Sequence, residues 1–297
     1  TDGLFYVKSA SGRDAYKSII DADRHSMFEL LTDGTDLRIS NLTIQNARKG
    51  NNEDGSVIFL NSDSTVTLTG VILSENIKAA IYNLRGVVNI TDTTVNNASN
   101  SYNIIINNDR LNTFGTNLFG SAVKNDTSGV IVTKGKNTFE KTIANDGRIT
   151  FSGDDTISGI SGSGVVIFAE NSSDPEAATS VSGTVAAELE LHVENQVTLK
   201  EGSEFNLNAG DFWTDKGSII LDGGVLNYDI SETLQNLFRK FKDGKTMQLY
   251  NNEIKGIAAI DWKEFPQALI VSEKSFQCGL IADRLTDIKS LLELFAK

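Results

Sequence analysis

Short segments in which polar and apolar residues alternate recur along this chain, and they constrain its fold more than any other feature. Three of them read DLRISNLTIQNA at 36–47, STVTLTGVILSEN at 64–76 and GVVNITDTTVNNA at 86–98. Alternation with a period of two is the pattern of a β-strand with one buried face, and the β-branched residues common here favour strands. Because each segment is too short to bury its own apolar face, the segments must pack on one another.

One apolar position returns in every repeat, at intervals of 18 to 29 residues, and predicts an inward-facing column made of Ile44, Leu73, Val95, Leu118, Phe139 and Ile157. Further strands are expected at 56–60, 79–84, 103–107, 129–133 and 164–169. A β-propeller needs longer antiparallel blades, and a leucine-rich repeat needs a regular leucine and asparagine frame. We therefore expect an all-β protein, a right-handed parallel β-helix in which each coil offers two or three short strands.

The β-helix is expected to span residues 1–229, with the polar stretch around Pro175 forming a loop. Residues 230–297 break the strand pattern, and two amphipathic helices are predicted there as an α/β or helical cap. The first helix starts at Ser231, stops at Gly244 and has an apolar stripe of Leu234, Leu237, Phe238 and Phe241. The second has its stripe at Ile281, Leu285, Ile288, Leu292 and Phe295. Such a cap would cover the apolar end of the solenoid.

Charge and cysteine content narrow the classes of partner. With 27 basic and 39 acidic residues the net charge is −12, which disfavours nucleic acid and anionic membrane surfaces. The single cysteine, Cys278, excludes an intramolecular disulfide and is expected to be a small buried apolar residue. No apolar run approaches the roughly 20 residues that span a bilayer. Since the chain begins at Thr1, we expect a processed piece of a longer precursor.

The segment IIDADRHSMFELLTDGTDLRISNLTIQNA, followed by DGSVIFL, LSEN and KAAIYNL, resembles the repeats of bacterial autotransporter passengers, polymorphic outer-membrane proteins and adhesin-like proteins. The resemblance covers roughly residues 19–170. The motifs AAIYN at 79–83 and LSEN at 73–76 are near those of the families, whereas the Gly-Gly pair that the families write is mostly lost. The resemblance implies a β-helix displayed at a cell surface, with any membrane barrel encoded elsewhere.

Few residues could support catalysis, and no catalytic site is predicted. The compact acidic candidates are Asp21 and Asp23 with Arg24, and Asp154 with Asp155, because β-helical polysaccharide lyases and glycosidases place carboxylates on an outer sheet. The alternative interpretation makes DADR a turn and SGDDTISG a solvent-exposed corner. His25 and His192 lie in different repeats, and no serine occupies a nucleophile elbow.

Binding motifs are equally sparse, and no metal site or cofactor is predicted. Asp21 and Asp23, or the segment NNEDG at 51–55, offer oxygen ligands for calcium, but without a calcium-loop motif. Asparagines at the repeat corners are expected to form hydrogen-bond ladders, namely Asn46, Asn76, Asn97 and Asn107. Glycosylation triplets at Asn41, Asn89, Asn97, Asn125 and Asn171 are expected by chance in so asparagine-rich a chain.

These observations together predict a secreted or cell-surface protein, with a bacterial outer surface the favoured location. Its expected function is that of an adhesin-like passenger that binds a host or matrix protein or glycan, or neighbouring copies, without catalysis and without inserting into a membrane. Two alternatives stay open: a carbohydrate-active β-helix enzyme and a surface subunit that polymerises end to end. A groove with convergent carboxylates would favour the enzyme, and bare strand edges at a coil end would favour the polymer.

Overall fold

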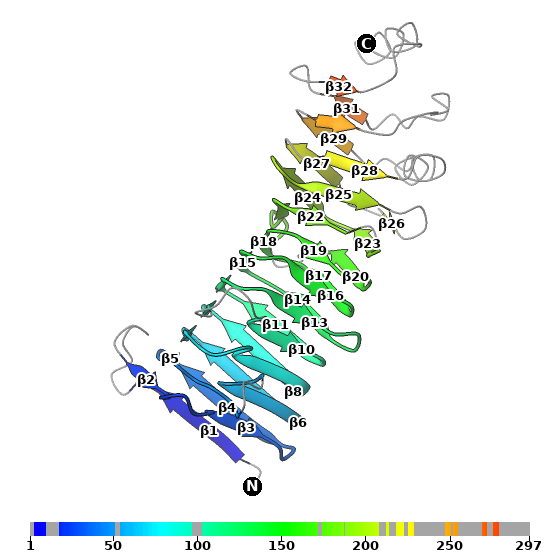
Figure 1. Cartoon of the computed structure of the whole chain (residues 1–297). Coiled ribbons are helices and arrows are strands. Elements are labelled where there is room, and N and C mark those ends of the chain that lie inside the picture. The colour runs from blue at the N-terminus through cyan, green and yellow to red at the C-terminus, as the bar shows by residue number, and fades with distance from the viewer. Residues whose placement is uncertain are drawn as a thin grey trace, which may run out of the picture.

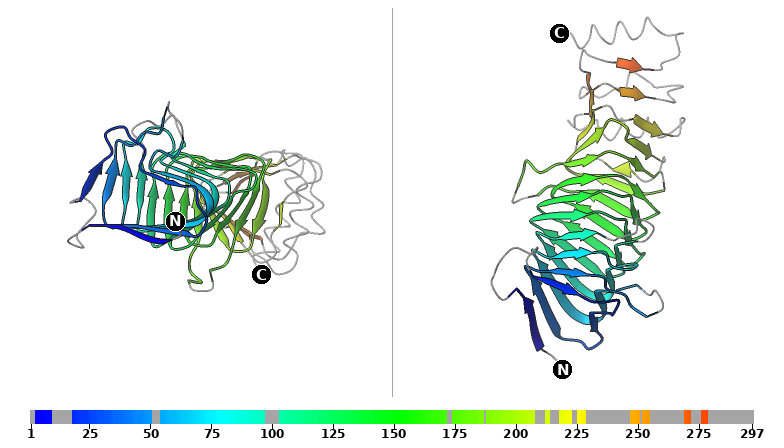
Figure 2. Two further views of the ribbon diagram at one scale, coloured as in Figure 1. Left: turned by 90° about the horizontal axis from the view of Figure 1, so that it is seen from below. Right: turned by 60° about the vertical axis from the view of Figure 1, so that its left-hand side comes forward.

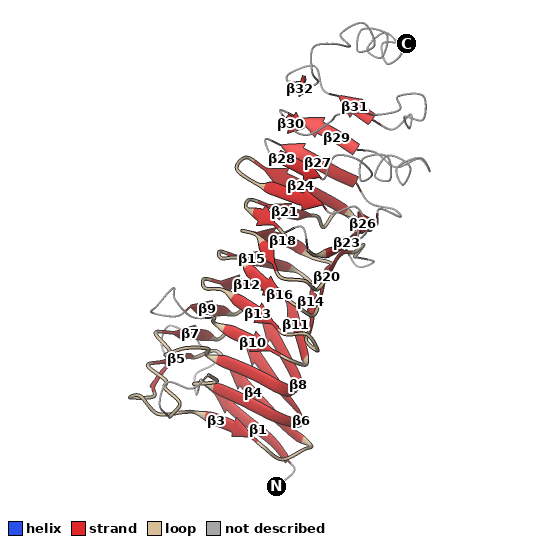
Figure 3. Cartoon of the chain, turned by 45° about the vertical axis from the view of Figure 1, so that its right-hand side comes forward, coloured by secondary structure: helices blue, strands red, loops and turns tan. Residues whose placement is uncertain are grey.

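The computed structural model is an elongated stack of parallel β-strands, with the N-terminus at one end and the last strands at the other (Figure 1). It describes residues 3–9, 18–50, 54–96, 103–171, 174–186 and 188–205 with their side chains. It describes the backbone alone for 206–207, 212–213, 218–222, 225–228, 247–250, 252–254, 269–271 and 276–278. Within these residues every regular element is a strand (Figure 3). The predicted all-β parallel β-helix is confirmed.

Strands of successive coils pair in parallel and form three ladders along the stack (Figure 2). The first ladder contains β3 (Phe28–Leu30), β6 (Ile58–Thr69), β8 (Ile81–Thr91), β10 (Ile105–Asn107), β13 (Val123–Asn125), β16 (Ile143–Asn145), β19 (Ile160–Ser161), β22 (Thr184–Val185), β25 (Glu204–Leu207), β28 (Val225–Tyr228), β30 (Asn252–Ile254) and β32 (Phe276–Cys278).

The second ladder shares the long strands β6 and β8, which turn a corner and continue into it. Its other members are β1 (Gly3–Lys8), β4 (Thr35–Ser40), β11 (Arg110–Phe114), β14 (Val130–Thr133), β17 (Arg148–Phe151), β20 (Val165–Phe168), β23 (Glu190–Val193) and β26 (Phe212–Trp213). Gly86 is at the corner of β8 with φ 122°, and a Cβ there would lie 2.6 Å from the carbonyl oxygen of Ser62. Only glycine fits that corner without strain.

The third ladder completes each coil. It contains β2 (Ile19–Asp21), β5 (Thr43–Gln45), β7 (Ile72–Ser74), β9 (Thr94–Asn96), β12 (Thr116–Phe119), β15 (Lys136–Phe139), β18 (Asp154–Ile157), β21 (Thr179–Val181), β24 (Gln196–Lys200), β27 (Ser218–Asp222), β29 (Met247–Tyr250) and β31 (Leu269–Val271). The strands predicted at 56–60, 79–84 and 103–107 belong to the first ladder, and those at 129–133 and 164–169 to the second. Full coils therefore carry three strands, or two where β6 or β8 turns the corner and belongs to two ladders.

The predicted inward column lies in the third ladder, with one error. Cα pairing runs from Ile44 through Leu73 and Val95 to Phe119, and then through Phe139 to Ile157, all buried. Leu118 pairs instead with Thr94 and Thr138 on the outer face and is only half-buried. The prediction was one residue out of register at this strand, and a shift of one residue reverses the face of a strand.

Aromatic rings fill the interior of the middle coils. Phe119 stacks on Phe139 with ring centroids 4.7 Å apart, and Phe151 stacks on Phe168 at 5.6 Å. An edge-to-face contact of 6.2 Å between Phe139 and Phe151 joins the two pairs across the core. Because parallel in-register strands superpose equivalent side chains, a phenylalanine in one coil comes to lie on the phenylalanine of the next.

A ladder of buried amides runs along the end of the first-ladder strands. The side-chain Nδ2 of Asn83 donates to Oδ1 of Asn107 at 2.9 Å, Asn107 donates to Asn125 at 2.8 Å, and Asn125 donates to Asn145 at 2.8 Å. Each amide also donates to backbone carbonyls at the following corner, as Asn125 does to Gly129 at 3.0 Å. The ladder begins abruptly, because Leu60 precedes Asn83 in the register and leaves Oδ1 of Asn83 buried without a partner.

A second polar ladder follows the Gly-x-Asn or Gly-x-Asp pattern at the start of three consecutive third-ladder strands. Asn117 Nδ2 donates to Asn137 Oδ1 at 2.9 Å, and Asn137 Nδ2 donates to Asp155 Oδ1 at 2.7 Å. All three side chains are buried. Every donor points toward the next coil, so the last member needs only acceptor oxygens, and a carboxylate meets that need.

Parallel pairing continues beyond the expected boundary at 229. β29 pairs with β27, β30 with β28, β31 with β29 and β32 with β30. Cys278 pairs with Ile254, and the same column contains the buried residues Val185 and Phe205 in earlier coils. The two predicted cap helices lie outside the described residues.

Candidate functional site

The first acidic candidate forms a tight corner after β2. Asp23 and Arg24 turn the chain with positive φ angles of 43° and 64°. Asp21 Oδ1 accepts the backbone N–H of Asp23 at 3.0 Å, and its Oδ2 accepts the amides of Asn46 at 2.9 Å and Gln45 at 3.1 Å. These bonds, that of Asp23 first, lower the pKa of Asp21 because they stabilise its charged form. The structure thus supports the turn interpretation of DADR.

A hollow of about 560 Å³ adjoins this corner and is lined by Asp21, Asp23, Arg24, Asn46, Glu75 and Ile77. Glycoside hydrolysis requires one carboxyl group that stays protonated, and the pKa of Asp21 is shifted in the opposite direction. No group of histidine, cysteine and acidic side chains among the described residues is arranged to hold a metal ion. Residues 51–53 of the other calcium candidate lie outside the described part of the chain. The hollow offers oxygen acceptors and one guanidinium for polar binding.

The second acidic candidate, Asp154 with Asp155, does not form a catalytic pair. The two residues are neighbours in β18, so their side chains point to opposite faces of the strand. Asp154 is exposed and lies 3.7 Å from Lys136 Nζ, whereas Asp155 is completely buried. The expectation of a solvent-exposed corner is wrong for Asp155, because the Gly-x-Asp pattern continues an inward ladder of amides.

The two histidines lie in different parts of the solenoid. His25 is exposed after the corner at Asp23, and its Nδ1 lies 3.2 Å from the carbonyl oxygen of Ala22. His192 is half-buried on β23, and its Nε2 lies 2.6 Å from Glu190 Oε1. Neither forms part of a nucleophile, base and acid arrangement among the described side chains. Their observed roles are local hydrogen bonds.

The predicted asparagine ladder is partly confirmed. Asn107 belongs to it, whereas Asn46 and Asn76 make separate corner bonds, Asn46 to Asp21 and Asn76 to the backbone N–H of Ala47 at 2.9 Å. Asn97 lies outside the described residues. The other members were missed: Asn83, Asn125 and Asn145 in the first ladder, and Asn117, Asn137 and Asp155 in the third. Recurrence of Asn as the last residue of short apolar strands was the signal for the first ladder.

The glycosylation triplets differ in accessibility. Asn125 is completely buried in the amide ladder and cannot carry a glycan in the folded chain. Asn41, Asn89 and Asn171 are half-buried. Asn89 also accepts a hydrogen bond from Asn112 at 2.9 Å on the outer face of the second ladder.

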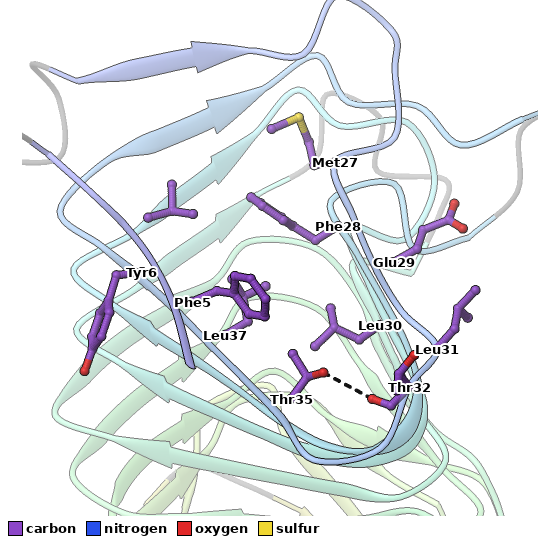
Figure 4. A pocket seen from close by; sticks show the side chains of 11 residues that line it. Phe5, Tyr6, Met27, Phe28, Glu29, Leu30, Leu31, Thr32, Thr35 and Leu37 are labelled. Atoms are coloured by element: carbon purple, nitrogen blue, oxygen red, sulfur yellow. Dashed lines mark hydrogen bonds between the residues drawn. The ribbon is translucent and has the colours of Figure 1, made fainter. Parts of the chain in front are cut away.

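The N-terminal end of the stack presents apolar side chains to solvent. A hollow of about 450 Å³ opens there, and Phe5, Phe28 and Leu30 face one another across it (Figure 4). Phe5 pairs with buried Leu37 and is nevertheless 48% exposed. Among the described residues β1, β2 and β3 each have a paired strand on one side only. This end combines unpaired backbone edges with an apolar interior.

No helix in the described part of the chain is long and apolar enough to cross a membrane. Neither a protein-family model nor a curated protein nor a solved structure matches this chain.

Proposed function

We propose that this chain is a surface-displayed, adhesin-like β-helix that binds host or matrix molecules through its outer faces and loops without catalysis. The main support is a row of hydroxyl side chains on the outer face of the third ladder, which we call the hydroxyl row. It consists of Thr138, Thr156, Ser180 and Thr198, which are paired in consecutive coils. In-register pairing spaces these hydroxyls by about 4.8 Å along the stack.

Such a row suits recognition of an extended polar ligand. Hydroxyls both donate and accept hydrogen bonds, and the β-helix core holds them in place at little further entropic cost on binding. The ion pair of Lys136 with Asp154 borders the row in the same strands. The location at a cell surface belongs to the same proposal and rests on the repeat resemblance.

The test measures binding of the immobilised chain to matrix proteins, such as collagen and fibronectin, and to a glycan array. Thr156→Lys and Ser180→Lys place bulky charges in the hydroxyl row and are expected to weaken binding at least tenfold. Thr150→Lys is the matched control, because Thr150 is a half-buried threonine on the outer face of the second ladder. Absence of any ligand, or equal loss in all three variants, would contradict binding through the hydroxyl row.

Catalysis is tested separately with polyuronates and neutral glycans. We expect no product, because the one described carboxyl group with a raised pKa, Asp155, is sealed in the core. Turnover that disappears in Asp21→Asn or Asp23→Asn would instead favour a carbohydrate-active enzyme that uses the hollow at Asp21.

End-to-end assembly with a second copy is the second candidate, and the N-terminal end favours it. The described strands β1, β2 and β3 each have one edge without a partner strand, and these edges beside exposed apolar residues form a surface that can add further strands. Light scattering over a range of concentrations should then show self-association of the whole chain. Leu31→Glu places a charge at the rim of the hollow, where Leu31 is 60% exposed, and should abolish it. A chain that stays monomeric at every concentration would rule out this candidate.

A further inference from the structure

The end of the second polar ladder is a carboxyl group whose surroundings differ from those of the amides before it. Asp155 Oδ1 accepts the amide of Asn137 at 2.7 Å, as an asparagine oxygen would. Its second oxygen, Oδ2, accepts the hydroxyl of Thr133 at 2.5 Å and the backbone N–H of Gly153 at 3.3 Å. The side chain has no solvent exposure. Asp155 therefore accepts hydrogen bonds on two oxygens, whereas an asparagine in the ladder has only one side-chain oxygen that can accept.

The preceding coil shows what happens when an amide occupies this place. Thr113 pairs with Thr133 in the second ladder, and Asn137 pairs with Asp155 in the third. The single oxygen of Asn137 already accepts from Asn117. The hydroxyl of Thr113 is consequently buried without a partner, whereas that of Thr133 is bound. The carboxyl group is thus built into this coil with a dedicated hydroxyl donor.

The network can also accommodate a proton. Thr133 Oγ1 lies 3.4 Å from the carbonyl oxygen of Thr150 as well as against Asp155. If a solvent proton binds Oδ2, the new O–H can donate to Thr133 Oγ1, whose own hydrogen turns to Thr150. Oδ1 continues to accept from Asn137. Both protonation states thus keep their hydrogen bonds, but only the charged state suffers the desolvation penalty of the core.

Other charges near Asp155 lie outside the core. The strands around it are β12, β14, β15, β17 and β21, and of these β12, β14 and β21 contain no titratable residue. Lys136 on β15, Arg148 on β17 and Asp154 on β18 are exposed. No described cation is paired with Asp155, and the charge of Asp154 disfavours a second negative charge. Protonation is thus the available way to neutralise this carboxyl group.

We propose that protonation of the buried Asp155 carboxyl group stabilises the middle coils of the β-helix, which are therefore more resistant to unfolding in mildly acidic solution than at neutral pH. Burial is the main cause that raises the pKa of Asp155 from 3.8 to about 6, against the opposing hydrogen bonds. The folded chain thus binds this proton more tightly than the unfolded chain. The gain in stability accumulates as the pH falls from about 6 toward 4 and is lost as the pH rises through 6.

The experiment compares chemical unfolding of the whole chain at pH 7.5 and pH 5 with that of Asp155→Asn. Removing the titrating group should take away about a tenfold change in the unfolding equilibrium constant between these two pH values, as the two pKa values require. Asp154→Asn is the matched control, because it removes the exposed neighbouring carboxylate and should retain the pH response of the wild type. An equal response in wild type and Asp155→Asn would overturn the proposal.

A direct titration covers the case in which Asp155→Asn does not fold. The side-chain carboxyl carbon of Asp155, followed by NMR in the unsubstituted chain, should titrate with a midpoint near 6. Thr133→Val removes the hydroxyl that stabilises the charged form and should raise that midpoint further. A midpoint near 4, or no upward shift in Thr133→Val, would overturn the proposal.

Discussion

The open N-terminal end and the middle coils solve the same packing problem in different ways. In the first coils the interior is mainly apolar, as at Leu37, Ile39 and Ile44, and Leu37 lines a hollow where Phe5 remains half exposed. The middle coils instead combine stacked phenylalanines with two ladders of buried amides. The first arrangement depends on a further layer to bury it, whereas the second is closed by its neighbours on both sides.

The difference shows what polar residues contribute to a solenoid core. Burying apolar side chains is favourable in any strand register that keeps the same face inward. Apolar residues therefore discriminate weakly between registers that differ by two residues. A buried amide discriminates strongly, because a register shift would leave its donors and acceptors without partners. The amide ladders therefore specify which residue pairs with which, and the apolar columns supply the driving force.

The largest effect is expected from breaking the amide ladder in its interior. Asn125→Ala removes the acceptor of Asn107 and the donor to Asn145, and it also removes the side-chain donor to the carbonyl oxygens of Gly129 and Arg148. Losing these four buried hydrogen bonds together should lower the free energy of unfolding by about 5 kcal/mol. Chemical denaturation measures it. Asn112→Ala removes an amide pair on the outer face and should cost less than about 1 kcal/mol. Equal losses would mean that the buried ladder adds nothing.

The next effect tests the register of the inward column. Phe119→Ala should lower the free energy of unfolding by about 4 kcal/mol, since it empties the site stacked on Phe139. Leu118→Ala should cost about 1 kcal/mol or less, because Leu118 lies half-buried on the outer face. Thermal or denaturant unfolding of the two single variants compares them. A larger loss in free energy of unfolding for Leu118→Ala would mean that Leu118 faces inward, as predicted from the sequence.

Most of the apolar architecture could be predicted from the sequence, because alternation and repeat length report directly on strands that stack. The predicted column was correct on that basis at Ile44, Leu73 and Val95. At 118–119 two apolar residues are adjacent, so composition alone does not say which faces inward. Gly115, with φ 64°, turns the chain just before this strand, so the inward and outward alternation starts anew there. The Gly-x-Asn pattern that begins at Gly115 then places Phe119 inside.

The polar interior was harder to predict, for a physical reason. A binary pattern assigns asparagine and aspartate to the surface, since burying either is costly unless a partner is in place. In a parallel solenoid the partner is the equivalent residue one coil away, so the cost disappears only after the chain is stacked. Asn137 shows this most clearly, because its oxygen accepts from Asn117 in one neighbouring coil and its Nδ2 donates to Asp155 in the other.

At the start of the amide ladder the same substitution can be compared at two buried leucines, one that pairs with an asparagine and one that pairs with apolar residues. Leu60→Asn would place an amide above Asn83, whose Oδ1 is buried and has no partner. Leu68→Asn puts the same change between Ile39 and Ile90, which are both buried and apolar. Because one new amide pair forms only at position 60, the loss in free energy of unfolding should be smaller there, by about 2 kcal/mol. Equal losses measured by denaturant unfolding would show that the ladder cannot be extended toward the N-terminus.

The smallest effect is expected at the open end, where a phenylalanine is removed as at position 119. Phe5→Ala should lower the free energy of unfolding by only about 1 kcal/mol, because Phe5 is already 48% exposed and leaves no sealed cavity. Calorimetry at a low protein concentration measures this loss without contributions from self-association. A loss as large as that of Phe119→Ala would show that the N-terminal end is covered in solution. In that case the melting temperature of the unsubstituted chain should rise with protein concentration if a second copy supplies the cover, and stay constant if the chain covers itself.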